Sequence, residues 1–500
     1  MFTLVDPQYM RAWEALYFRE SSVSSIVVMK RAARAVTDVV LERFPDAQDI
    51  HIACGPGGNG GDGYACARQL RDAGRNVRVF AAAPAHSPDA VTNAERARAC
   101  GIPILGAEDA KDVLPDLWID CIYGTGLSRA PSGASAELIT RMNRDRVAGA
   151  KTVAADIPSG LNGNTGKRFQ PCVCADLTVT FQFVKYGTVL QDGLDVCGEL
   201  IVRDVGFPEK IYPDRAPSLL TPDDLRSGFR PRPRNIHKNE CGHLLIIAGS
   251  MGMAGAAALC ARAALRSGVG LVTIACPESI VPILQTLAPC AMCVPLPQRG
   301  GAIGPEARPL LRNILDGKSA VVIGPGLTRR VPASIVATVL ESPLHAVIDA
   351  DALNLIAENT ELKDLLTPRH VLTPHPGEAA RLLGRPCRDP LSDALALSSA
   401  HGDATVVWKG ASRIIVGDEG ATFISTSGAS GMARGGSGDV FAGILGALMA
   451  GSCRSPLDVA MACEIHGLAG MLAQEKYGPR GMNAADIIEF IPEVFKRYVD

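Results

Sequence analysis

The segment His51–Tyr64 reads HIACGPGGNGGDGY, an apolar, strand-like run that ends in a cluster of glycines. Gly55, Gly57 and Gly60 satisfy the spacing G-x-G-x-x-G of a dinucleotide-binding loop. Such a loop also needs an acidic residue about 20 residues further on, at the end of the next strand, to bind the ribose hydroxyls. The next strand-like run, NVRVFAAAP (76–84), ends in alanines and a proline. The sequence therefore argues against an ordinary dinucleotide site.

The glycine loop still has two chemical uses. Backbone N–H groups between a strand and a helix bind anions, and the helix dipole assists them. Asn59 and Asp62 add oxygen ligands that suit a hard cation. The same two residue types also build turns without any ligand, so this loop alone leaves a cation site and a plain turn equally open.

Two further strand ends carry similar loops. Asp120 lies in WIDCIYGTGLSRAPSG (118–133), and Asp156 ends a strand just before Pro158, Ser159 and Gly160. Ligands of open parallel sheets gather outside the carboxyl ends of the strands. Three polar, glycine-containing loops at such ends predict one shared site.

The order of elements predicts an α/β chain with two domains. Up to about residue 210, strand-like runs such as Asp49–Cys54 and Lys151–Ala155 alternate with helical patterns such as Gly63–Ala73, which predicts a parallel sheet flanked by helices. A segment rich in proline and arginine follows, and then a second alternation begins. We predict domains at 1–212 and 235–500, joined by a linker at 213–234.

Composition limits the partners. A formal net charge of -2 gives no reason to expect nucleic acid. Fifteen scattered cysteines predict reduced thiols and a cytoplasmic protein. The longest apolar run, LLIIAGSMGMAGAAALCARAAL, is interrupted by glycines and predicts a strand and a buried helix rather than a membrane span.

The strongest local motif of the second half is TSGASGMARGGSGDVFAGILGALMAG (426–451). Its glycines run directly into an apolar helix with Asp439 in the first turn, so that backbone N–H groups form an anion hole beside a carboxylate. Such a carboxylate suits a base that deprotonates an attacking hydroxyl. As a plain helix-terminal charge, Asp439 would contribute less than about 1 kcal/mol to stability.

The first half resembles the NAD(P)H-hydrate epimerase domain in CGPGGNGGDG, DCIYGTG, DIPSGLNGNTG, SSIVVMKRAAR and the tail DLTVTFQFVKYGTVLQDG. The resemblance implies a potassium site at Asn59, Asp120 and Ser159, and a catalytic acid at Asp156. It implies substrate-binding loops made of Gly60, Gly61, Asp62, Gly63, Gly124, Thr125, Gly126, Leu127, Ser128, Arg129 and Ala130. Two departures from the family's usual residues are Gly58, where a second Asn is usual, and Lys30, where Glu is frequent.

The second half resembles the ribokinase-like fold, and within it the nucleotide-dependent NAD(P)H-hydrate dehydratase domain, in VVIGPGLT, VIDADALNLI, LTPHPGEAARLLG and WKGASRIIV. The resemblance implies binding of ADP or ATP, with Mg²⁺, by Lys409, Gly410, Ala411, Ser412, Arg413, Gly435, Gly436, Ser437 and Gly438. The pocket that binds the hydrate would be lined by Ala257 or Ala258, Gly326, His375 and Asp439. Arg434 replaces a usual Thr and could contact a phosphate or alter nucleotide selectivity.

Together the resemblances predict a bifunctional repair enzyme with an N-terminal Rossmann-like three-layer domain and a C-terminal ribokinase-like domain. It would interconvert the R and S hydrates NADHX and NADPHX, dehydrate the S form, and assemble as a homo-oligomer. One alternative is a hydroxymethylpyrimidine- or hydroxyethylthiazole-type kinase fused to a non-catalytic nucleotide-binding module. In another, the first half is a scaffold that has lost catalysis.

Overall fold

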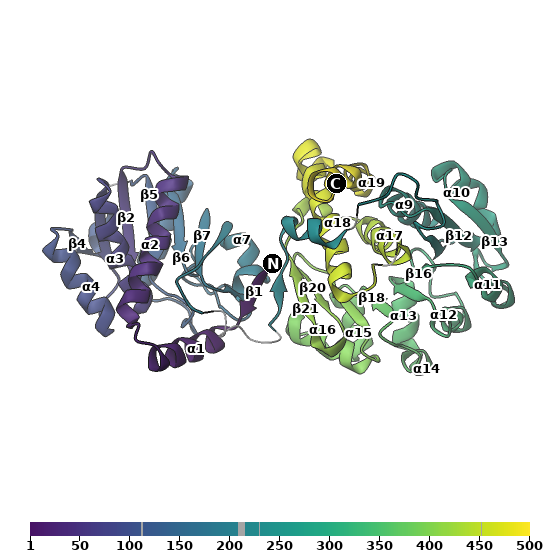
Figure 1. Ribbon diagram of the computed structural model, residues 1–500, viewed down its shortest axis with the longest axis horizontal. Helices are drawn as coiled ribbons and strands as arrows, with labels where there is room; N and C mark the ends of the chain where they lie inside the picture. Colours follow the sequence, from purple (N-terminus) through teal and green to yellow (C-terminus); the bar gives the residue numbers. More distant parts are fainter. Residues whose placement is uncertain (112–113, 209–215, 230, 452) are drawn as a thin grey trace. The chain divides into compact units, whose positions relative to one another are not determined.

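The computed structural model describes residues 1–500 except 112–113, 209–215, 230 and 452. The chain divides into two compact units, Phe2–Ala216 and Pro217–Asp500. Both are α/β, as predicted (Figure 1). Within the predicted linker 213–234, the described residues include strand β10 (Ser218–Leu219), which pairs with strand β21 (Thr422–Ser425) of the second unit, and helix α8 (Leu225–Gly228).

The first unit is built on a parallel sheet in the order β4-β3-β2-β5-β6-β7-β9. Its strands are β2 (Asp49–Cys54), β3 (Asn76–Ala81), β4 (Ile104–Gly106), β5 (Leu117–Cys121), β6 (Lys151–Ala155), β7 (Leu177–Phe181) and β9 (Glu199–Arg203). A separate parallel pair is formed by β1 (Phe2–Val5) and β8 (Val184–Lys185).

Side chains alternate across this sheet and enter two cores. Ile52 and Ile119 belong to the core under helices α2 (Ser25–Arg43), α3 (Gly58–Asp72) and α4 (Pro88–Ala99). Ala53 and Trp118, one residue along in each strand, belong to the core under helix α5 (Ala134–Val147). Because successive strand residues point to opposite faces, the unit has the predicted three layers.

Helix α3 begins five residues earlier than predicted. The sequence suggested a start at Gly63, whereas the helix starts at Gly58, so that the glycines form its first turn. A Cβ at Gly60 would overlap the carbonyl oxygen of Gly55, and one at Gly63 would lie 2.6 Å from the Cys54 sulfur. The missing side chains therefore let the helix start directly against the ends of β2 and β5.

The second unit has a sheet in the order β13-β12-β11-β16-β17-β18-β19-β20-β21-β10, parallel from β13 to β19 and antiparallel from β19 to β21. The remaining strands are β11 (His243–Ile247), β12 (Leu271–Pro277), β13 (Met292–Leu296), β16 (Ala320–Ile323), β17 (His345–Ile348), β18 (His370–Leu372), β19 (Thr405–Trp408) and β20 (Arg413–Val416).

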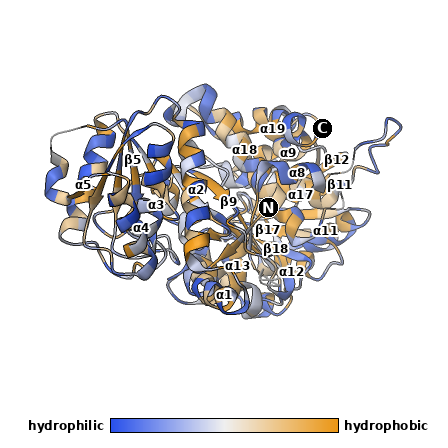
Figure 2. Ribbon diagram, turned by 60° about the vertical axis from the view of Figure 1, so that its left-hand side comes forward, coloured by the Kyte–Doolittle hydropathy of each residue, from blue (hydrophilic) through white to orange (hydrophobic). Residues whose placement is uncertain are grey.

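Both faces of this sheet are covered. Leu244, Val322 and Val347 enter the core shared with helices α9 (Ala254–Arg266), α17 (Ser437–Ala450), α18 (Pro456–Gly481) and α19 (Ala484–Tyr498). The next residues in two of these strands, Leu245 and Ile323, are equally buried. Figure 2 shows this pattern as hydrophobic strands between helices with hydrophilic outer surfaces. None of the described helices combines the length and the apolar composition needed to cross a membrane.

Helix α17 lies unusually close to its neighbours. A Cβ at Gly443 would overlap the carbonyl oxygen of Cys260 on α9, and one at Gly446 would overlap Val322 on β16. These two glycines fix the height of the helix above the sheet, and with it the position of the glycine loop at its start.

We expect Gly446→Ala to destabilise the second unit by about 1–3 kcal/mol, because the methyl group must displace packed atoms of Val322 and Leu244. Urea unfolding followed through Trp408 fluorescence measures this change. Gly255→Ala is the control, because the space around its Cβ position is open and alanine favours the helix by up to about 1 kcal/mol. Equal stability of the two variants would contradict the close packing of α17.

Candidate active sites

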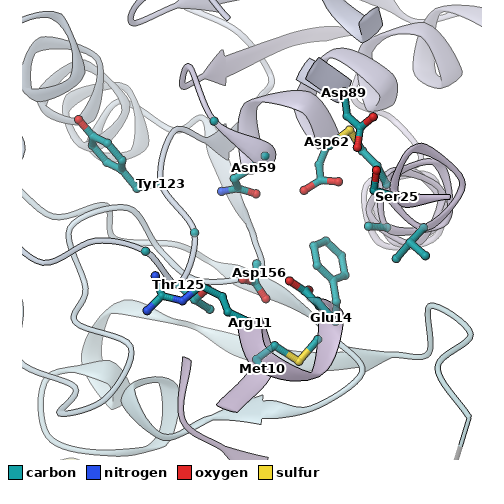
Figure 3. A pocket seen from close by; sticks show the side chains of 18 of the residues that line it. Met10, Arg11, Glu14, Ser25, Asn59, Asp62, Asp89, Tyr123, Thr125 and Asp156 are labelled. Atoms are coloured by element: carbon teal, nitrogen blue, oxygen red, sulfur yellow. The ribbon is translucent and has the colours of Figure 1, made fainter. Parts of the chain in front are cut away.

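The first unit contains a cavity of about 530 Å³ at the carboxyl ends of its central strands. Its wall combines helix α1 (Pro7–Glu20) with α2, the start of α3 and the loops after β5 and β6. Figure 3 shows Asn59, Asp62, Asp156 and Glu14 around it. The cavity therefore brings together the three loops that the sequence predicted to share a site.

Asp156 has a strained backbone conformation. Its φ of 69° lies in the left-handed region, which residues other than glycine seldom occupy. The backbone N–H of Asp156 donates to the Val179 carbonyl at 2.7 Å, and its Oδ1 lies 2.5 Å from the ammonium Nζ of Lys185. Such strain at a cavity wall indicates a functional position for the carboxylate.

Lys185 was not predicted. Its side chain is 1% exposed, and its ammonium also donates to the Phe181 carbonyl at 2.9 Å and to the Thr180 hydroxyl at 3.1 Å. The only available sequence signal was a lysine inside the apolar run FQFVKYG. A buried ammonium is retained where it is paired, and here it is paired with Asp156.

Two carboxyl groups of the cavity, those of Glu14 and Asp62, have raised pKa values. Burial raises the pKa of Glu14 to about 7; the negative charge of Asp156 adds to the rise, while Lys185 and Arg11 oppose it. Burial and the charge of Asp156 likewise hold the pKa of Asp62 well above its usual range. Glu14, on helix α1, carried no local sequence signal and was not predicted.

Two of the three predicted potassium ligands contact one another. The buried Asp120 carboxylate accepts hydrogen bonds from the Ser159 N–H and hydroxyl, both at 2.7 Å, and from the Ile122 N–H at 3.1 Å. Burial raises the pKa of Asp120 to about 6, although the hydrogen bonds from Ser159 oppose the rise. Asn59 donates to the Ala155 carbonyl at 3.3 Å, while its own Oδ1 is buried without a hydrogen-bond partner among the described residues.

Only some residues of the two predicted substrate loops line the cavity. Gly124, Thr125, Gly126 and Leu127 line the cavity together with Asp62. The other members of the two loops do not line it, since Ser128, Arg129 and Ala130 are exposed, and Gly60, Gly61 and Gly63 are buried at the base of α3. Gly58, the departure from the family pattern, lines the cavity with open space around its Cβ position.

In the second unit the predicted base, Asp439, lies in the first turn of α17 near a second ion pair. Lys409 pairs with the buried carboxylate of Asp349, which also accepts a hydrogen bond from the Thr373 hydroxyl at 2.7 Å. Burial and the charge of Asp349 raise the pKa of Asp439 to about 6, and Lys409 lowers it. Asp349 lies at the end of the strand-like run in VIDADALNLI, and its part in this ion pair was not predicted.

The residues predicted to bind the hydrate in this unit lie in a helix cap, a turn and the core. His375 caps helix α15 (Pro376–Leu383), its Nδ1 accepting from the Gly377 N–H at 3.0 Å, and burial lowers its pKa. Gly326 has a φ of 64° and accepts a hydrogen bond from the Ser250 hydroxyl at 2.8 Å. Ala257 is fully buried in the core beneath α9.

The predicted nucleotide residues form two groups. Gly435 and Gly436 precede α17, Ser437 and Gly438 open it, and a Cβ at Gly438 would lie 3.6 Å from the Lys409 ammonium. Beyond Lys409, the segment Gly410–Ser412 leads into β20. These glycines therefore place unhindered backbone close to the ion pair.

Two arginines of this region make contacts within the protein. The buried guanidinium of Arg413 donates to the Ser427 carbonyl at 2.7 Å and contacts His466 Nδ1 at 3.1 Å. Arg434 donates to the Arg480 carbonyl at 2.6 Å and to the Pro479 carbonyl at 3.3 Å. A nucleotide contact of Arg413 would therefore come from its backbone, and Arg434 is engaged near the end of α18.

Two α/β units, each with a carboxylate beside an ion pair and a glycine-opened helix, define an enzyme with two sites. The family model described as NAD(P)H-hydrate dehydratase matches residues 244–493, and that of the YjeF-related protein N-terminus matches residues 25–187. The bifunctional NAD(P)H-hydrate repair enzyme Nnr of Moorella thermoacetica is 36% identical over 99% of this chain and 96% of its own. The chain therefore belongs to the family of bifunctional NAD(P)H-hydrate repair enzymes.

Two further relatives of the same name agree with this membership. The enzyme of the same name from Coxiella burnetii is 36% identical over 94% of both chains, and that of Escherichia coli is 34% identical over 93% of this chain and 89% of its own. Among solved structures, an ADP/ATP-dependent NAD(P)H-hydrate dehydratase from Bacillus subtilis, co-crystallised with ATP/Mg²⁺, is 25% identical. It covers 56% of this chain and 98% of that one with a TM-score of 0.48. The family predicted from the sequence is confirmed, and a fused vitamin-type kinase is disfavoured.

We expect Lys185→Met to destabilise the first unit by about 3 kcal/mol at pH 8, because it leaves the Asp156 carboxylate buried without its partner. The double variant Lys185→Met/Asp156→Asn removes the unpaired charge and should recover much of the loss.

Urea unfolding in a Trp408→Phe background, in which the remaining tryptophans report on the first unit, measures both variants. A loss for Lys185→Met that is not recovered in the double variant would show that the ion pair is not the cause.

Proposed function

We propose that this chain repairs hydrated nicotinamide cofactors in two steps. The first unit interconverts the R and S epimers of NADHX and NADPHX, and the second dehydrates the S epimer with ADP or ATP. The observation that carries the proposal is the match of the chain, over 99% of its length, to an enzyme named a bifunctional NAD(P)H-hydrate repair enzyme. The two acid–base sites supply one reaction centre for each activity.

In the first unit, we assign proton transfer at the C6 hydroxyl to Asp156, supported by its strained backbone and its contact with Lys185. Residues Gly124–Leu127 and Asp62 line the space beside it and would bind the rest of the hydrate. The backbone N–H groups at the start of α3 suit the phosphate groups of the substrate.

Asn59, Asp120 and Ser159 fit a potassium ion. The buried Asn59 Oδ1 has no hydrogen-bond partner among the described atoms, and Asp120 and Ser159 offer further hard oxygen donors from neighbouring strand ends. When bound there, potassium would supply positive charge next to the phosphate-binding loops.

In the second unit, the Asp439 carboxylate accepts the proton of the C6 hydroxyl as that oxygen attacks the terminal phosphoryl group of ADP or ATP. The N–H groups of Gly435–Gly438 face the transferred phosphoryl group. Loss of phosphate and of the C5 proton then restores the reduced ring, because phosphate leaves far more easily than hydroxide. Asp349 and Asp439 are hard oxygen donors that suit Mg²⁺, which would offset the nucleotide charge.

We also propose that the protein acts in the reducing cytoplasm as a homo-oligomer on small molecules alone. The fifteen free thiols suit a reducing compartment. The near-neutral net charge gives no support for a nucleic-acid partner.

We expect Asp156→Asn to reduce epimerisation by at least about 100-fold while dehydration of S-NADHX continues, and Asp439→Asn to do the reverse. Epimer interconversion is followed by chromatography of purified R-NADHX, and dehydration by the recovery of reduced-nicotinamide absorbance with ADP or ATP. Each variant is the control for the other. Absence of absorbance recovery by the unmodified chain with either nucleotide would refute the proposed function.

Removal of potassium should lower the melting temperature of the first unit, because the partnerless Asn59 oxygen loses its ligand. We expect a potassium-dependent rise in melting temperature, measured against choline chloride at equal ionic strength, that Asn59→Ala abolishes. Asn164→Ala, in an exposed loop of the same unit, is the control and should retain the rise. An equal rise in all three proteins would be a general salt effect and would refute this site.

A further inference from the structure

Inversion at C6 needs proton transfer on two faces of the substrate ring. C6 of the hydrate carries a hydroxyl and is bonded to the ring nitrogen N1. Protonated, the hydroxyl leaves as water while the N1 lone pair forms a C=N bond, which makes C6 planar. Water that adds from the opposite face must lose a proton there. A single carboxylate at a fixed wall of the cavity serves only one of these faces.

We propose that Glu14 is the second acid–base group of the epimerisation site and acts across the substrate ring from Asp156. This inference rests on the function proposed above for the first unit. Glu14 belongs to a different wall, helix α1, whereas Asp156 directly follows strand β6. Both carboxyl groups line the one cavity, and Figure 3 shows both side chains directed to the same part of it.

Helix α1 is anchored firmly enough to position a catalytic group. The Asp6 carboxylate caps it by accepting hydrogen bonds from the N–H groups of Gln8 at 2.8 Å and Tyr9 at 2.7 Å, and Pro7 occupies its first turn. On the cavity side, Met10 is buried one turn before Glu14. Positions four residues apart share one helix face, so Glu14 is directed inward with Met10.

The electrostatics link Glu14 to the Asp156–Lys185 ion pair. Besides burial, the pKa of Glu14, about 7, responds to the charges of Asp156, Lys185 and Arg11. Near neutral pH Glu14 therefore exists in both protonation states, as a group that alternates between acid and base must. Besides Glu14, the charged or titratable groups lining this cavity are Arg11 on α1, Asp62 on α3, His86 before α4, Asp89 on α4, Tyr123 after β5, Asp156 after β6, and Lys185 on β8.

The proton balance closes over one turnover. Glu14 gives its proton to the C6 hydroxyl, the C6–O bond breaks, and the N1 electron pair forms the C=N bond. Water then bonds to C6 from the other face, the C=N electrons return to N1, and Asp156 takes the proton that the water loses. The reverse reaction exchanges the two roles. The forward reaction leaves Glu14 ionised and Asp156 protonated, and exchange with solvent water returns the proton to Glu14 before the next forward turnover.

Asp62 is the rival donor, because its pKa is also raised and it lines the same cavity. Figure 3 places Asp62 on the side of Asp89 and Ser25, whereas Glu14 is directed toward Asp156. The charge of Lys185 acts on Glu14 and is absent from the interactions that shift Asp62. These positions favour Glu14 as the partner of Asp156.

The test is the pH profile of epimerisation in Glu14→Gln, measured on the full chain with purified R-NADHX. In the unmodified enzyme, kcat/KM should fall as the pH rises through about 7, where Glu14 loses its proton. Glu14→Gln should lower kcat at least about 100-fold with little change in KM and abolish this decline. Glu14→Asp should restore part of the rate together with the decline.

Glu20→Gln, at the exposed last residue of α1, is the matched control and should keep the unmodified rate and profile. ATP- or ADP-dependent dehydration verifies that each variant retains a working second unit, and near-UV circular dichroism verifies the first. The proposal is overturned if Glu14→Gln keeps the rate and the decline near pH 7, or if Asp62→Asn alone removes the decline. If Asp156→Asn also retains full epimerisation, the proposed site itself has failed; an inactive Asp156→Asn with an unaffected Glu14→Gln refutes only the role of Glu14.

Discussion

In both units a helix is in direct backbone contact with a neighbouring segment at a glycine, and the rest of the structure depends on this contact. At Gly60 a helix starts against the carbonyl of Gly55, and at Gly443 another helix lies against the carbonyl of Cys260. Neither approach leaves space for a Cβ atom. Because these helices begin at the carboxyl ends of parallel strands, the close contact places their free N–H groups where loops from neighbouring strands converge. The anion binding proposed for both sites therefore depends on packing at glycines.

The two sites share one arrangement of charged groups. Each holds a carboxylate–lysine pair, Asp156 with Lys185 and Asp349 with Lys409. In each, a neighbouring carboxyl group outside the pair has a raised pKa, about 7 for Glu14 and about 6 for Asp439. The lysine neutralises one carboxylate, and the second carboxyl group has no such partner. Burial therefore raises the pKa of the second group toward neutrality.

Local patterns predicted what depends on local structure. The predicted strands Asp49–Cys54 and Lys151–Ala155 agree with the observed strands residue for residue, because apolar runs bounded by turn residues define them. The start of α3 was misjudged because glycines are poor helix formers in isolation, and tertiary contact overrides that preference. Lys185 and Glu14 could not be assigned from spacing, since each gains its meaning only from a carboxylate far away in the chain.

The titrations also bear on why the two activities suit one chain. In the proposed mechanisms, epimerisation uses a protonated Glu14 and weakens above about pH 7, whereas dehydration uses an ionised Asp439 and weakens below about pH 6. Between these values both units hold much of their reactive form. A mixture of both epimers can then be converted completely, because the first unit regenerates the S epimer under the conditions in which the second unit consumes it. With the roles proposed for Glu14 and Asp439, the opposite protonation requirements predict that the coupled repair is fastest just below neutral pH, because burial raises the pKa values of the two carboxyl groups by different amounts.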